Sequence, residues 1–197
     1  ADAAFASKVP DSIDPLDDDN LLISARHTST IYKLDRQTGE IIWRLGGKKS
    51  DFAMGAGTQF AFQHDARGHA GDVVSVFDDG AYSPESAIEP ASRAIVLQLD
   101  TGAMTAELAR AEVNPENALS LAMGNTQLLP DGGMFVGWGT TPECSEFAAD
   151  GTLRFDAVIA GGALSYRAFR GAWTGRPTAP PNLKAEPNSD GSVQRYV

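Results

Sequence analysis

The chain has 197 residues, of which 42% are hydrophobic and 21% charged, and its formal net charge is −10. This composition is typical of a globular domain with a core, and an acidic surplus without a basic stripe argues against a nucleic-acid partner. No apolar run reaches the ~18 residues of a membrane span, and no signal peptide is visible. The single cysteine, Cys144, excludes a disulfide within the chain.

Short stretches of alternating apolar and polar residues, separated by glycine-containing turns, follow one another along the chain. The first three are residues 20–26, 29–35 and 40–45, and the turn 36–39 (Arg-Gln-Thr-Gly) joins the last two. Aromatic and β-branched residues with a period of two, interrupted by such turns, are typical of antiparallel hairpins. Further strands of this kind are predicted at 72–77, 94–100, 104–108, 125–129, 134–139 and 152–158.

One hairpin occurs three times, at residues 31–43, 96–106 and 145–155, each time as a strand, a turn containing aspartate and a second strand. Two further strands precede each copy. The repeating unit is therefore roughly 40 to 60 residues long with four strands, which is the pattern of a β-propeller blade.

The repeat predicts an all-β fold, a β-propeller of four-stranded antiparallel blades. Three complete blades are expected at about 11–47, 63–112 and 124–161, and the start of a fourth over 165–197, with its inner strand at 165–173 and its next strand beginning at 191–197. Because propellers close with about four to eight blades, residues 1–197 are interpreted as a single incomplete propeller, a fragment of a longer protein. Terminal blades without a neighbour are poorly stabilised, so missing blades or an oligomer are expected to cover them.

His64 is the most reactive candidate among only three histidines. It follows a glycine-rich loop at 54–58, lies between the polar residues Gln63 and Asp65, and precedes the predicted strand 72–77. An imidazole titrates near neutrality and can act as base, ligand or nucleophile. The same context also fits a structural histidine whose ring caps a turn.

The innermost strand of each predicted blade carries polar residues. Such residues are unexpected on a buried strand unless they face water or a ligand, so these positions predict the wall of a central channel. The equivalent positions are Asp11, His64, Asn125 or Gln127, and Tyr166 or Arg167.

Short motifs follow one another along the chain at residues 20–27, 41–47, 50–52, 63–65, 76–80, 92–93, 124–127, 137–139, 146–147 and 165–167. In this order and spacing they resemble the arylsulfotransferase family over about residues 11–181. The resemblance implies a six-bladed propeller outside the cytoplasm, in the periplasm or extracellular. It also implies that a sulfuryl group moves from an aryl sulfate to a phenol by a ping-pong reaction through a sulfated channel histidine, without an adenosine phosphosulfate donor.

This resemblance makes His64 the candidate nucleophile and Arg26 the candidate cation for the sulfuryl oxygens. A guanidinium suits an oxyanion because its donors form a fixed fork, although Arg26 could equally form a surface ion pair with a nearby aspartate. Asp65 or Gln63 could hold the tautomer of His64, and Tyr166 could stack on a phenol. The expected substrate-binding residues are Gln63, Asp11, Asn125, Gln127, Tyr166 and Arg167.

One departure from the family concerns its His-x-Asn-Ser motif on the first inner strand. This chain has Val9-Pro10-Asp11-Ser12, so valine stands for the histidine and aspartate for the asparagine. A carboxylate near a sulfate repels it. A propeller that binds ligands or partners without catalysis is therefore an alternative.

A quinoprotein-type propeller is a further alternative because residues 34–43 resemble quinone-binding repeats. The chain lacks the paired cysteines and calcium ligands expected of that class, and the acidic turn 17–20 is followed by leucine rather than glycine. Residues 46–50 lack the spacing of a P-loop. No cofactor and no metal site is therefore predicted.

Overall fold

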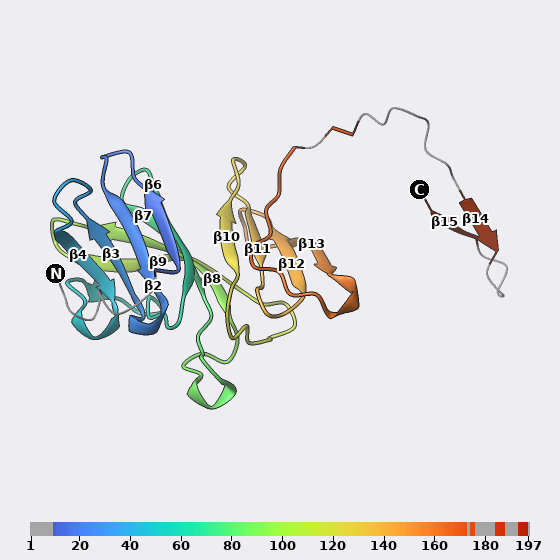
Figure 1. Ribbon diagram of the computed structural model, residues 1–197, viewed down its shortest axis with the longest axis horizontal. Helices are drawn as coiled ribbons and strands as arrows, with labels where there is room; N and C mark the ends of the chain where they lie inside the picture. The colour runs from blue at the N-terminus through green and yellow to red at the C-terminus, as the bar shows by residue number, and fades with distance from the viewer. Residues whose placement is uncertain (1–9, 173, 176–183, 188–192, 197) are drawn as a thin grey trace.

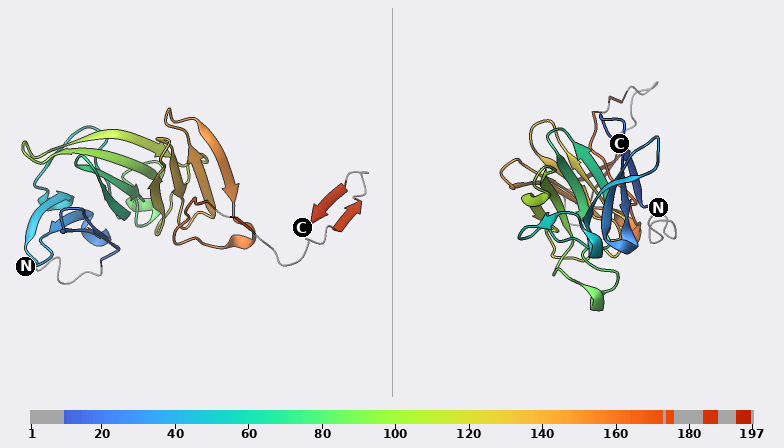
Figure 2. Two further views of the ribbon diagram at one scale, coloured as in Figure 1. Left: turned by 90° about the horizontal axis from the view of Figure 1, so that it is seen from above. Right: turned by 90° about the vertical axis from the view of Figure 1, so that its left-hand side faces the viewer.

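The computed structural model describes residues 10–172, 174–175, 184–187 and 193–196. Three β-sheets lie side by side in chain order, the first blue, the second teal to green and the third yellow to orange (Figure 1). Seen from above, they follow one another around an open arc (Figure 2).

Each of these sheets contains a meander of four strands in sequence order, and each strand of the meander is antiparallel to the next. This meander arises because alternating residues make two-faced strands and the turns between them are short. The strands of the first sheet are β1 (Ser12–Pro15), β2 (Leu21–Ala25), β3 (Thr30–Leu34) and β4 (Ile41–Gly46).

The second sheet has the longest strands and one unexpected addition. The two-residue strand β5 (Ala53–Met54) pairs in parallel with the outer strand β9, so this sheet has five strands. Its meander consists of β6 (His64–His69), β7 (Val73–Asp78), β8 (Arg93–Asp100) and β9 (Thr105–Val113).

The third sheet completes the set of three predicted blades. Its strands are β10 (Asn125–Leu128), β11 (Met134–Gly137), β12 (Glu143–Phe147) and β13 (Leu153–Val158). A separate hairpin pairs β14 (Lys184–Pro187) with β15 (Val193–Tyr196). The all-β propeller architecture that the repeat predicts is confirmed.

Adjacent blades pack through apolar side chains from their facing surfaces. One cluster joins the first two blades and includes Leu22, Ile31 and Val76; another joins the second and third and includes Phe77 and Trp138. The rings of Phe77 and Trp138 meet edge to face with centroids 5.8 Å apart, a favourable aromatic geometry. The tryptophans that the structure describes therefore hold blades together.

Inner strands of neighbouring blades are joined by side chains. Ser12 and Asp14 on β1 accept hydrogen bonds from the backbone N–H groups of Ala66 and Gly68 on β6. Segment 166–170 attaches to β10 in the same manner, because the amides of Asn125 and Gln127 bond to the backbones of Ala168 and Arg170.

Segment 166–170 thus takes the place of the inner strand of a fourth blade, although it has no strand partner of its own among the described residues. The expected end of that strand, Trp173, lies outside the described residues. β15 falls within the predicted stretch 191–197, but it pairs with β14.

Apolar side chains gather on the last described blade and on the segment that follows it. Phe155, Val158, Leu164 and Phe169 are about half exposed or more, with Val158 at 67%. We propose that a further blade or a second copy of the chain covers this surface, because a blade buries its apolar residues against a neighbour.

We therefore expect the isolated 197-residue chain to self-associate. Light scattering at increasing protein concentration should show a rising mean mass, and the double substitution Phe155→Ser with Val158→Thr should lower it. A monodisperse monomer over the whole concentration range would contradict this expectation.

Candidate functional site

The site lies where strand ends from all three blades meet at one edge. β2 and β7 end there with Ala25 and Asp78, and β6 begins there with His64. The backbone around His64 is unusual: Phe62 and Asp65 have positive φ values of 55° and 50°, and a bulge interrupts the pairing of β6 with β7. Bulges and left-handed residues of this kind re-aim side chains next to functional sites.

The buried imidazole of His64 has a defined tautomer. Its Nδ1 lies 2.6 Å from Oδ2 of Asp79, and its Nε2 accepts a hydrogen bond of 3.1 Å from the backbone N–H of Met123. A nitrogen that accepts carries a lone pair, so the proton is on Nδ1 and points at Asp79. Nε2 is therefore the nucleophilic atom of this ring.

Burial sets the protonation of this pair. Desolvation, helped by the positive charges of Arg26 and Arg167, lowers the pKa of His64 to about 3. Desolvation also raises the pKa of Asp79, whose Oδ1 has no hydrogen-bond partner among the described residues. At neutral pH the ring is neutral, and Oδ2 of Asp79 accepts from Nδ1–H whether the carboxyl is ionised or not.

Arg26 is the cation nearest this edge and follows β2 directly. Its Nη2 donates to the carbonyl of Leu121 at 2.6 Å, and its guanidinium lies 5.4 Å from the ring centroids of both Phe62 and Tyr82. Its Nε is buried without a hydrogen-bond partner in the part of the chain that the structure describes. The group is therefore held by cation–π contacts and keeps an unsatisfied donor.

Asp11 lies directly against the candidate nucleophile. One carboxylate oxygen, Oδ2, accepts from the backbone N–H of Asp65 at 2.9 Å, and the other, Oδ1, lies 3.2 Å from Nε2 of His64. Burial raises the pKa of Asp11 to about 6. This carboxyl can therefore exchange a proton near neutral pH.

Arg167 and Tyr166 reach the site from the segment that follows the third blade. Nε of Arg167 pairs with Oδ1 of Asp65 at 3.1 Å, and its charge lowers the pKa values of His64 and Asp11. The half-exposed ring of Tyr166 packs under the guanidinium of Arg167 at 5.1 Å. The structure thus brings the charge of Arg167 close to His64, with the ring of Tyr166 packed against its guanidinium.

The amides that the sequence places at the site are used elsewhere. Gln63 is fully buried and donates to Ser24 and to the carbonyl of Thr30 in the first blade. Asn125 and Gln127 hold segment 166–170. The expectation that Gln63 or Asp65 fixes the tautomer of His64 is corrected, because Asp79 makes that contact.

Sequence reasoning missed four contributors: Asp79, the backbone of Met123, and the rings of Phe62 and Tyr82. Asp79 lies in the motif 76–80, where an apolar strand ends in two aspartates. The first of these, Asp78, pairs with Arg93 at 2.7 Å. The motif therefore contained the signal, but only the fold shows which aspartate faces His64.

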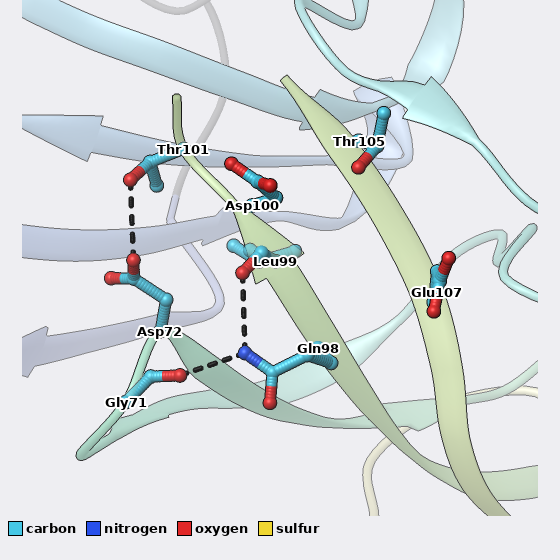
Figure 3. Close-up of a pocket in the computed structure, with 8 residues that line it drawn as sticks. All are labelled: Gly71, Asp72, Gln98, Leu99, Asp100, Thr101, Thr105 and Glu107. Carbon is cyan, nitrogen blue, oxygen red and sulfur yellow. Dashed lines mark hydrogen bonds between the residues drawn. The ribbon is translucent and has the colours of Figure 1, made fainter. Parts of the chain in front are cut away.

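Two hollows lie at different places relative to this region. One, of about 540 Å³, is away from the site at the opposite ends of β7, β8 and β9, where Asp72, Gln98 and Thr101 line it (Figure 3). The other, of about 470 Å³, adjoins the site, since Phe62 lines it together with Tyr32 and Lys48. His27, which follows Arg26 directly, also lines the second hollow.

Within the part of the chain that the structure describes, none of the helices could span a bilayer. No group of three or more His, Cys, Asp or Glu residues within those ranges is placed to hold a metal ion.

Solved structures were compared with the chain. A protein of unknown function from Bacteroides caccae matches with a TM-score of 0.50 and 14% identity, over 95% of this chain and 52% of that one. PQQ-bound aldose sugar dehydrogenase from Streptomyces coelicolor matches with a TM-score of 0.49 and 16% identity, over 73% and 46%. Catalytically inactive virginiamycin B lyase from Staphylococcus aureus, with quinupristin, matches with a TM-score of 0.49 and 10% identity, over 79% and 43%.

The chain therefore spans about half the length of these structures. At such identities the likeness concerns the fold alone. No curated protein sequence matches the chain.

A sequence profile gives the family. The arylsulfotransferase (ASST) profile matches residues 6–160, a span that contains all three blades together with Asp11, Arg26, His64 and Asp79. This match covers well over half of the 197 residues. The chain belongs to the arylsulfotransferase family.

Proposed function

We propose that the protein transfers a sulfuryl group from an aryl sulfate to a phenol, with Nε2 of His64 as the atom that carries the group between them. The observation that supports this most strongly is the tautomer of His64. The ring is neutral and its proton is on Nδ1, facing Asp79. A neutral imidazole carries a lone pair on Nε2, and once the N–H of Met123 releases it this nitrogen can attack sulfur and leave again.

The first half-reaction follows from this arrangement. The lone pair of Nε2 forms a bond to sulfur while the bond from sulfur to the aryl oxygen breaks. Negative charge spreads over the sulfuryl oxygens, and the positive charge of Arg26, which already acts on the ring of His64, stabilises it. The ring becomes cationic, and Oδ2 of Asp79 accepts a hydrogen bond from its Nδ1–H, which holds the ring in place.

One backbone group, the N–H of Met123, and one side chain, that of Arg167, complete the oxyanion site. The N–H of Met123 now donates to Nε2 and can turn to a sulfuryl oxygen once sulfur occupies that nitrogen. Arg167 adds a second positive charge that already acts on the ring. In the second half-reaction the phenol oxygen attacks sulfur and Nε2 leaves.

The aryl group has an aromatic surface available beside Arg26. Phe62 borders the hollow of about 470 Å³, and Tyr82 on the neighbouring loop is 59% exposed. Aromatic rings bind one another in offset or edge-to-face geometry. The expected partners are small aryl sulfates and phenols, and the family resemblance supports a location in the periplasm or outside the cell.

A binding module without catalysis is the second candidate, and Asp11 favours it. A carboxyl 3.2 Å from Nε2 stands where sulfur would approach, and an ionised carboxylate repels a sulfate. The quinoprotein alternative has no such support: residues 34–43 form the end of the β3–β4 hairpin, and Trp43 packs edge to face on Phe52.

A transfer assay separates the two candidates. The protein is mixed with 4-nitrophenyl sulfate, and release of 4-nitrophenol is followed with and without added phenol. Our proposal expects release that depends on the phenol and yields phenyl sulfate. Binding of the donor without release would favour the non-catalytic module.

A further inference from the structure

The position of Asp11 against Nε2 of His64 suggests a role in proton transfer, beyond the repulsion of a sulfate. We propose, on the basis of the proposed function, that Asp11 is the general acid and base of the reaction. It would donate a proton to the departing aryl oxygen and take one from the incoming phenol. The family motif has asparagine at this place, and an amide cannot do this.

The geometry presents one oxygen of Asp11 to the reacting atoms. Oδ2 is anchored by the backbone N–H of Asp65, so the carboxyl cannot rotate freely. Oδ1 is left facing Nε2 of His64 at 3.2 Å. The aryl oxygen is bonded to the sulfur that Nε2 attacks and leaves from the side of that sulfur opposite Nε2, so the proton passes from Oδ1 to it alongside the sulfuryl group.

The proton and electron pairs balance over the cycle. In the first half-reaction Nε2 bonds to sulfur, the sulfur–oxygen bond breaks, and the aryl oxygen takes the proton from Oδ1 of Asp11. In the second, the phenol oxygen bonds to sulfur, the bond from Nε2 to sulfur breaks, and the phenolic proton returns to Oδ1. Asp11 ends as it began, and the proton on Nδ1 of His64 stays with Asp79.

The surroundings make Asp11 suited to both directions. Burial raises its pKa, the N–H of Asp65 and the charges of Arg167 and Arg26 lower it, and the Asp65 carboxylate raises it, for a value of about 6. Catalytic acids and bases work best with a pKa near the working pH. The remaining ionisable groups facing Asp11 are His64, which stays neutral, and Asp79, whose pKa Asp11 itself helps to raise.

This role predicts opposite pH dependences for the two half-reactions. The acid must be protonated when the donor reacts, so sulfation by a poor leaving group should slow as the pH rises through about 6. The base must be ionised when the acceptor reacts, so transfer to phenol should speed up through the same pH. The low pKa of His64 keeps that ring from producing either limb.

The test compares Asp11→Asn with the native protein on two donors, phenyl sulfate and 4-nitrophenyl sulfate. Asparagine keeps the shape and can still accept from Asp65, so thermal melting should show that the fold is retained. With phenyl sulfate, whose leaving group needs a proton, the rate should fall by roughly a hundredfold or more. With 4-nitrophenyl sulfate the rate of the first half-reaction should fall far less. In Asp11→Asn the change of rate with pH near 6 should disappear.

Asp14→Asn is the matched control, because Asp14 is on β1, the strand that Asp11 directly precedes, and contacts Gly68 and Arg67 rather than His64. It should keep the native ratio of rates for the two donors. If Asp11→Asn loses rate equally on both donors, or keeps the native pH profile, the role of Asp11 is overturned. The proposed function survives that result as long as His64 still becomes sulfated. A native protein that takes no sulfuryl group from 4-nitrophenyl sulfate would overturn the proposed function as well.

Discussion

Replacing His64 with alanine is expected to reduce sulfuryl transfer to background, a loss of roughly three orders of magnitude or more. The methyl group of alanine has no lone pair, and the remaining cations can only bind the substrate. Transfer from 4-nitrophenyl sulfate to phenol is the measurement. His69→Ala is the control, because His69 lies on the same strand but contacts Ser75.

The fold should survive this change, because His64 contributes polar contacts at the edge of the blade and not to either apolar cluster between blades. Far-UV circular dichroism and thermal melting of His64→Ala should match those of the native protein. Transfer that persists in a folded His64→Ala protein would show that the sulfuryl group passes directly between donor and acceptor.

Asp79 is expected to increase the rate of transfer and to lower the stability of the fold. Asp79→Ala should lower transfer by roughly a hundredfold to ten-thousandfold, the range seen when the residue that orients a catalytic histidine is altered. Asp79→Asn should lose less, because its amide oxygen can still accept from Nδ1–H. The two variants therefore separate the loss of any partner for Nδ1 from the replacement of the carboxyl by an amide of the same shape.

The same Asp79→Asn variant should be more stable than the native protein at neutral and alkaline pH. Burial raises the pKa of Asp79 to about 10, so folding must bind a proton that the unfolded chain releases above pH ~4. The free energy of unfolding of the native protein therefore falls as the pH rises from ~4 to about 10. The difference in stability between the variant and the native protein should vanish below pH ~4. Urea unfolding at several pH values measures it; a variant that is less stable at pH 8 would refute the assignment.

The blades could be predicted from the sequence because period-two alternation and glycine turns are local signals. β5 could not be, since two residues that pair in parallel with a distant strand carry no local pattern. Segment 166–170 likewise owes its position to the side chains of Asn125 and Gln127. Both are results of packing between blades.

The site could be predicted only in part for a similar reason. Gln63 and His64 are neighbours, yet successive residues of a strand face opposite sides, so Gln63 turns to the first blade and His64 to the site. Asp79 reaches His64 from 15 residues away in the sequence, at the end of an adjacent strand. The order of the motifs pointed to His64 and Arg26. Identifying Asp79 as the partner of the His64 ring required the register of β6 and β7.

The central claim is that His64 carries the sulfuryl group, and peptide mapping of the protein after reaction tests it most directly. The protein is mixed with 4-nitrophenyl sulfate without acceptor, quenched at alkaline pH, digested and analysed by mass spectrometry. We predict one added sulfuryl group on the peptide that contains His64, lost when phenol is added before the quench and absent in His64→Ala. A sulfuryl group on another residue, or none while 4-nitrophenol is released and phenyl sulfate is formed, would contradict the account.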